Sequence, residues 1–153
     1  MTQEERYANR DGSYSAWHRR HSTRRFVGIE QAQLLAMIDL DACLYVEYDD
    51  GTKEPLALIE VAMDVGQEHK TATVTTNLAK RANIPCLVVL YSLNDKPNPA
   101  DSKCADIASF RVKRLWPRSQ HRDWKILTPS EYAQSLLDLR KYKANQLDSE
   151  VIP

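Results

Sequence analysis

The chain has 153 residues, a hydrophobic fraction of 42% and a formal net charge of zero, because 21 lysines and arginines balance 21 aspartates and glutamates. The length fits one domain with a single core, and neutrality excludes a uniformly basic nucleic-acid coat protein or a strongly acidic tail protein. The charge is segregated, however: residues 1–25 hold six bases and three acids, residues 26–65 one base and nine acids, and residues 66–153 fourteen bases and nine acids.

A soluble cytoplasmic protein is expected from the cysteines and the apolar segments. The three cysteines form no CxxC pair, which predicts neither a disulfide scaffold nor a zinc ribbon and favours small core residues: Cys43, Cys86 and Cys104. The first thirty residues lack the apolar segment of a secretory signal. The longest apolar run, residues 84–91, is too short to span a bilayer.

The N-terminal part of the chain predicts a tail followed by two short helices. Residues 1–12 are polar and are expected to be disordered. A helix is predicted from residue 13, and three side chains at helical spacing share one side of it: Tyr14, Trp17 and His21. A second helix is predicted over residues 31–37, and the residues expected to turn inward there are Leu34, Leu35 and Met37.

A β-hairpin, a helix and a buried strand are predicted for the middle of the chain. Residues 39–48 and 56–63 favour strands, and the turn signal Asp49-Asp50-Gly51 separates them. An amphipathic helix is predicted over residues 67–83, with three residues on its inner face: Val74, Leu78 and Ala82. Residues 84–93 form an apolar run typical of a central strand covered on both faces.

The C-terminal third predicts a loop, an edge strand and a last helix. The composition of residues 94–104 indicates a loop, and alternation over residues 107–115 predicts an edge strand with one solvated face. Thr128, Pro129 and Glu131 have the spacing of a capping box at a helix start. The element order therefore predicts a single α/β domain over residues 13–143, a three-layer α/β/α sandwich with a small mixed sheet, followed by a frayed tail over residues 144–153.

Several familiar sites are excluded by the residues present. The chain has four glycines, and their spacing forms neither a phosphate-cradling loop nor a dinucleotide fingerprint. No GxSxG nucleophile motif occurs. His18 and His21 are three residues apart and can share a helix face, but a metal site would lack a third ligand, and a solvated face is the alternative.

Carboxylates in the predicted hairpin are the strongest candidates for chemistry. Asp39 and Asp41 share one face of the first strand by period-two spacing, and Glu60 lies within the apolar second strand. Burying a carboxylate in an apolar strand costs free energy unless the group is paired, protonated or bound to a cation. Its nearest partners across the hairpin are acids, and a divalent hard cation resolves such repulsion. The alternative is that the aspartates are solvated and Glu60 pairs with an arginine from residues 17–25 or 111–125.

This arrangement of an aspartate, a turn, an acidic apolar strand, a helix and a second apolar strand matches a known nuclease pattern. The residues that carry the match are Ile38-Asp39-Leu40-Asp41, Pro55-Leu56-Ala57-Leu58-Ile59-Glu60-Val61-Ala62, the YSAWHR stretch of residues 14–19, and Phe110-Arg111-Val112. Over about residues 14–140 the chain resembles the PD-(D/E)XK nuclease superfamily. The resemblance implies a restriction-endonuclease-like fold, Mg²⁺ or Mn²⁺ as cofactor, and nucleic acid, most simply DNA, as partner. Members often dimerise, so a homodimer is a further expectation.

By position, the resemblance also implies the metal ligands. Asp41 and Glu60 would bind the ion together with the carbonyl of Val61, and Asp39 is the alternative to Asp41. In such enzymes the metal lowers the pKa of a water molecule that attacks the phosphodiester in line.

The chain departs from the family pattern at the position of the motif lysine, which is Ala62. Alanine cannot orient water or neutralise phosphate charge, so hydrolysis is expected to be weakened or lost. Lys70, on the helix predicted to follow, is the candidate catalytic replacement, although it also fits an ordinary solvated lysine. Gln67 is a second polar candidate, and Lys53 lies at the opposite end of the hairpin.

Basic residues interleaved with aromatics predict contacts with nucleic acid, because lysine and arginine meet phosphates while bases stack on aromatic rings. The candidate contact residues are Arg19, Arg20, Arg24, Arg111, Lys113, Arg114, Arg118 and Trp116. The same pattern fits a solvated edge strand whose tryptophans pack in the core or in a dimer. The alternative function is therefore a non-enzymatic interaction module with the same fold, which binds an acidic protein or itself.

Overall fold

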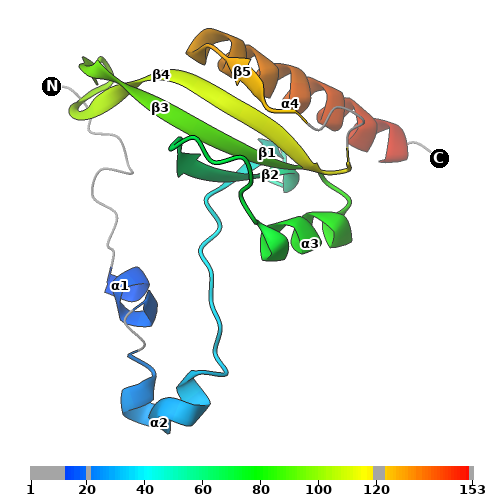
Figure 1. Cartoon of the computed structure of the whole chain (residues 1–153). Helices are drawn as coiled ribbons and strands as arrows, with labels where there is room; N and C mark the ends of the chain where they lie inside the picture. The colour runs from blue at the N-terminus through cyan, green and yellow to red at the C-terminus, as the bar shows by residue number, and fades with distance from the viewer. Residues whose placement is uncertain (1–12, 20–21, 119–122, 152–153) are drawn as a thin grey trace, which may run out of the picture. The chain divides into compact units, whose positions relative to one another are not determined.

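The computed structural model describes residues 13–19, 22–118 and 123–151, and the chain divides into two units, Met1–Asp39 and Leu40–Pro153. The predicted tail over residues 1–12 lies outside the described residues. The first unit holds two short helices, α1 (Ser13–Arg19) and α2 (Arg24–Ala32) (Figure 1). The helix predicted from residue 13 is confirmed by α1, on which the rings of Tyr14 and Trp17 stack at 6.1 Å.

The second helix lies earlier in the chain than predicted. The structure places α2 before residue 33, and the backbone of residues 35–41 is neither helix nor strand. The residues predicted to turn inward are exposed instead: Leu34, Leu35 and Met37. The physical reason is that this short unit has almost no interior, since Ala32 is its one buried residue among those described.

The second unit is built on a five-stranded mixed sheet with the strand order β1-β2-β3-β4-β5. The strands are β1 (Ala42–Glu47), β2 (Lys53–Met63), β3 (Cys86–Asn98), β4 (Asp101–Trp116) and β5 (Lys125–Leu127). β1 and β2 form the predicted antiparallel hairpin, β2 and β3 are parallel, and the remaining pairs are antiparallel. The predicted α/β class and the mixed sheet are therefore confirmed.

Two helices cover this sheet, α3 (Thr73–Ala82) on one face and α4 (Pro129–Val151) on the other (Figure 1). α3 is the crossover that a parallel pair requires between β2 and β3. The predicted capping box opens α4: the Thr128 hydroxyl accepts the Glu131 N–H at 3.1 Å, and Glu131 Oε1 accepts the Thr128 N–H at 3.1 Å. No helix of the described residues is long and apolar enough to cross a membrane.

Three predicted boundaries in the C-terminal third are wrong. The predicted loop over residues 94–104 is mostly the outer end of the β3–β4 hairpin, which extends past the end of β2. β4 is not an edge strand, because the short β5 pairs with its Phe110–Val112 stretch. The last helix continues to Val151, through the segment predicted to fray after residue 143.

The sheet-facing side of α3 also differs from the prediction. Val74 and Leu78, predicted to face inward, are 56% and 42% exposed, and Ala82 is exposed as well, whereas Thr75 and Ala79 are buried. The two faces differ by one residue, or about 100° of rotation. The small side chains let the helix approach the sheet closely, and Ala79 packs there in a core cluster with Leu58 and Cys86.

Candidate functional site

One row of side chains crosses the α3 face of the sheet. Its position is fixed by Thr75 of α3, whose hydroxyl donates a hydrogen bond to Glu60 Oε1 at 2.5 Å. Across the neighbouring strands, Glu60 pairs with Val88 and Val88 pairs with Lys113. Continuing the β4–β5 pairing by one residue places Trp124 opposite Lys113. Residues that pair directly project to the same face, so all four side chains lie on the α3 side.

Asp41 lies at the end of this row, directly before β1. The β1–β2 register pairs Ala42 with Ile59, and its continuation by one residue brings Asp41 opposite Glu60. The Asp41 carboxylate accepts a hydrogen bond from the Val61 N–H at 2.8 Å. We refer to these residues as the site row: Asp41, Glu60, Val88, Lys113 and Trp124. The two carboxylates predicted to converge are therefore neighbours on adjacent strands.

The Val61 carbonyl faces the same edge of β2 as Asp41. The N–H and C=O of one residue in an extended strand point to the same side, and the Val61 N–H is bonded to Asp41. The three predicted ligands, Asp41, Glu60 and Val61, thus lie around the point where β1 begins. The alternative ligand, Asp39, belongs to the Met1–Asp39 unit and is exposed.

The cysteine nearest this row is a packing residue. Cys86 is fully buried, and the Thr76 hydroxyl donates to its Sγ at 3.9 Å. Burial raises the pKa of the Cys86 thiol, and the negative charge of Glu60 adds to the rise, so the thiol stays protonated at neutral pH. Cys43 and Cys104, which were also predicted as core residues, are exposed, because they lie on the sheet edge and on the outer hairpin.

The cation nearest to the missing lysine is already paired. The pairing Ala62–Leu90–Arg111 forms the next row on the same face. Arg111 donates two hydrogen bonds of 2.7 Å to Asp64 and one of 2.9 Å to the Gln67 carbonyl. This pairing lowers the pKa of Asp64 and raises that of Arg111. Arg111 therefore holds the segment that follows β2 in place, and its positive charge is neutralised by Asp64.

Trp124 lies against two cations of β4, Arg111 and Lys113. Its ring centroid is 4.8 Å from Arg111 Cζ and 5.7 Å from Lys113 Nζ, and its indole N–H donates to the Glu68 carbonyl at 2.9 Å. Such cation–π contacts hold the ring in place. Within the described residues, Lys113 forms no salt bridge, so its positive charge is available to a ligand. Sequence reasoning did not place Trp124 here, because β5 has only three residues and its pairing is not visible locally.

Lys70 and Gln67, the two polar candidates for the role of the motif lysine, do not belong to the site row. Lys70 is not on a helix: it precedes α3 by three residues and lines a groove with Thr76 and Lys80. Gln67 shapes the turn after β2, since its amide donates to the Met63 carbonyl at 3.1 Å and its Oε1 accepts the Val65 N–H at 2.8 Å.

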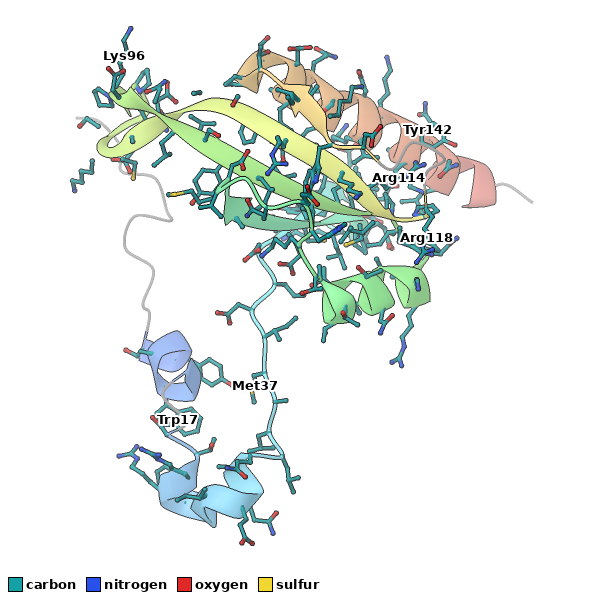
Figure 2. The ribbon with its side chains drawn as sticks, viewed as in Figure 1. Trp17, Met37, Lys96, Arg114, Arg118 and Tyr142 are labelled. Atoms are coloured by element: carbon teal, nitrogen blue, oxygen red, sulfur yellow. The ribbon has the colours of Figure 1, made fainter. Side chains whose placement is uncertain are left out.

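The other predicted nucleic-acid contacts are scattered. Trp116 packs against the Leu58–Ala79–Cys86 cluster rather than standing free on the surface. Strand alternation turns Arg114 to the face opposite Lys113, and Arg114 and Arg118 are both exposed (Figure 2). Arg24 is exposed in the first unit, whereas Arg20 and the side chain of Arg19 lie outside the described residues, as does His21.

Comparison with known proteins found no family model, curated protein or solved structure that matches this chain. The chemistry of the site therefore follows from its residues. The site row has acids at the β1–β2 end and a cation with an aromatic ring at the β4–β5 end. Val88 is fully buried between them, so the row forms an acidic half and a basic half.

Proposed function

We propose that the Leu40–Pro153 unit binds nucleic acid on the α3 face of its sheet, as a divergent PD-(D/E)XK-like protein. The site row carries the proposal, because it combines two adjacent carboxylates with Lys113 and Trp124 on one face. A lysine meets phosphates and an indole ring stacks on bases. The restriction-endonuclease-like, three-layer fold is part of the same proposal, supported by the hairpin, the crossover helix α3 and the helix on the other face.

The acidic half fits Mg²⁺ or Mn²⁺ as a cofactor. Asp41 and Glu60 offer carboxylate oxygens, and the Val61 carbonyl faces the same edge. Mg²⁺ commonly takes one or two carboxylates and completes its coordination with water and substrate phosphates. Among the described residues no group of three or more acidic, histidine or cysteine side chains gathers, so the proposed site depends on two carboxylates, a backbone carbonyl and water. A bound ion would supply Lewis acidity and neutralise phosphate charge.

Hydrolysis of the bound strand is proposed only as a weakened activity. Ala62 occupies the position of the motif lysine, and Arg111 on the same row is compensated by Asp64. Lys113 is separated from Glu60 by the buried Val88, so it does not replace the missing group beside the acids. Binding therefore stands as the main function, with phosphodiester cleavage reduced or lost.

Binding is tested by fluorescence anisotropy of the full chain with labelled single-stranded, duplex and branched DNA and with RNA, across a series of salt concentrations. We expect affinity to fall as salt rises, and Lys113→Ala to reduce the slope of log K against log salt by about 1. Lys141→Ala, an exposed lysine on α4, is the matched control and should leave the slope unchanged. Wild-type protein whose binding to every probe is absent or independent of salt would overturn the proposal.

Metal binding by the acidic half is tested separately by isothermal titration calorimetry with Mg²⁺ and Mn²⁺. We expect a binding heat for the wild type that disappears in Glu60→Gln, which keeps the hydrogen-bonding oxygen for Thr75 but removes the charge. Asp106→Gln is the control, because this aspartate lies on the outer part of β4 away from the acids. No heat for the wild type, together with no metal-dependent cleavage, would reject the metal site and leave nucleic-acid binding to stand alone.

The second candidate is a non-enzymatic interaction module that binds itself or an acidic protein. The observation that favours it is the first unit, whose large apolar side chains are exposed: Tyr14, Phe26, Val27, Ile29, Leu34, Leu35, Met37 and Ile38. Such residues are typical of contact surfaces. Light scattering over a concentration series tests self-association, and a monomer at every concentration would reject that form of the candidate.

A further inference from the structure

A polar groove runs along α3 on the side facing β4. Its volume is about 280 Å³, and its main lining residues are Lys70, Thr73, Thr76, Asn77, Lys80 and Leu115. Among the described residues, no carboxylate lines it. The groove therefore presents two lysines with no opposite charge among the described residues of its walls.

The groove is formed by one face of the helix and one loop. Thr73, Thr76, Asn77 and Lys80 follow the helical spacing that places side chains on a single side. Lys70 lines the groove from the loop before α3 and is partly buried there. Lys70 and Lys80 thus approach the groove from two different segments.

The chemistry of the lining fits a phosphate group. The ammonium groups, the Thr73 hydroxyl and the Asn77 amide all donate hydrogen bonds, which suits an anion rich in acceptor oxygens. The Thr76 hydroxyl is directed to Cys86 and is not counted among these donors. The groove is open to solvent along its length, so its lining would contact one phosphate group from one side rather than enclose a whole nucleotide cofactor.

The groove also lies beside the basic half of the site row. Leu115, its wall on β4, is two residues after Lys113. Lys113 pairs with Val88 on the α3 face, and Leu115 packs against the cluster that contains Ala79 of α3, so both residues lie on that face. The groove is thus within reach of a strand bound at Lys113. Resting on the proposed function, we propose that the Lys70–Lys80 groove binds a backbone phosphate of the same nucleic-acid strand, next to the one that Lys113 contacts.

The test uses the full chain carrying Lys70→Ala and Lys80→Ala together, in the same anisotropy assay. We expect the salt slope to fall by about 1 relative to the wild type, because one phosphate contact is lost, and the double replacement by arginine to restore it. Arg140→Ala with Lys141→Ala, two exposed charges on α4, is the control with the same loss of net charge and should keep the slope. Circular dichroism confirms that each variant is folded.

The outcomes separate this inference from the proposed function. If the double alanine variant keeps the wild-type slope while Lys113→Ala lowers it, the groove is rejected and nucleic-acid binding stands. An equal drop in the control pair also rejects the groove, because the effect is then one of net charge. If the wild type binds no probe in a salt-dependent way, both proposals are rejected: nucleic-acid binding by this unit and phosphate binding in the groove.

Discussion

The sheet face beneath α4 carries an aromatic contact, whereas the face beneath α3 combines a small core cluster with paired charged groups. On the α4 face, the Phe110 ring lies 4.2 Å from that of Tyr132, and Leu127 is buried opposite Phe110. The α3 face has Glu60 bonded to Thr75 and the Asp64–Arg111 pair. The contrast teaches that the hydrogen-bonded charged groups gather on one face, so substitutions at the α4 contact should change stability and those in the site row should change binding.

The largest expected effect is on the packed face. Phe110→Ala removes the ring that contacts Tyr132 and should lower the free energy of unfolding by about 3 kcal/mol. Urea denaturation measures this loss as a lower midpoint, with Lys141→Ala as a control within about 0.5 kcal/mol of wild type. An unchanged midpoint in Phe110→Ala would show that α4 does not anchor the sheet through this contact.

A smaller effect is expected on the charged face, with a defined pH dependence. Asp64→Asn removes the partner of Arg111 and should lower stability at neutral pH. Because Arg111 and the Gly66 N–H lower the pKa of Asp64 in the folded state, its contribution is present above the unfolded pKa and is lost as pH falls through the folded one.

Unfolding measured between about pH 5 and pH 2 should therefore show a shallower acid loss in Asp64→Asn than in the wild type. Asp95→Asn, an exposed aspartate on the outer hairpin, should leave the profile as it is. Parallel profiles for the wild type and Asp64→Asn would contradict a stabilising role for the pair.

The smallest effect concerns the start of α4. Thr128→Ala removes the hydroxyl that accepts the Glu131 N–H and should cost about 1 kcal/mol of stability. Nucleic-acid affinity should stay unchanged, because the cap is remote from the α3 face. Ser130→Ala in the same turn is the control. A loss of affinity in folded Thr128→Ala protein would show that the two faces are coupled.

Two features that depend on short-range signals were predicted from the sequence, the cap of α4 and the β1–β2 hairpin. The Thr128–Glu131 cap was predicted because both partners lie three residues apart, and the adjacency of Asp41 and Glu60 follows from one short hairpin. The position of Lys113 on the same row depends on the pairing of β2, β3 and β4, which join distant segments. Trp124 depends on β5, whose three residues carry no recognisable pattern.

The inner face of α3 was mispredicted for a different reason. Hydrophobic periodicity selects Val74 and Leu78, but close packing selects the smaller Thr75 and Ala79. The hydrogen bond from Thr75 to Glu60 also favours that rotation. Lys70 was placed on a helix because its segment shows no strand alternation, whereas the Asp64–Arg111 clamp and the Trp124–Glu68 bond hold the preceding segment in a loop.

The outer end of the β3–β4 hairpin has a consequence for self-association. β2 ends opposite Tyr91, so β3 continues with its β2-side edge unpaired by that strand. This stretch carries Asp95, Lys96 and Pro97, and Lys96 lies at the tip of the hairpin (Figure 2). Charged residues repel an incoming strand, and proline offers no N–H to it. The exposed ribbon is thereby protected against edge-to-edge aggregation by its own side chains.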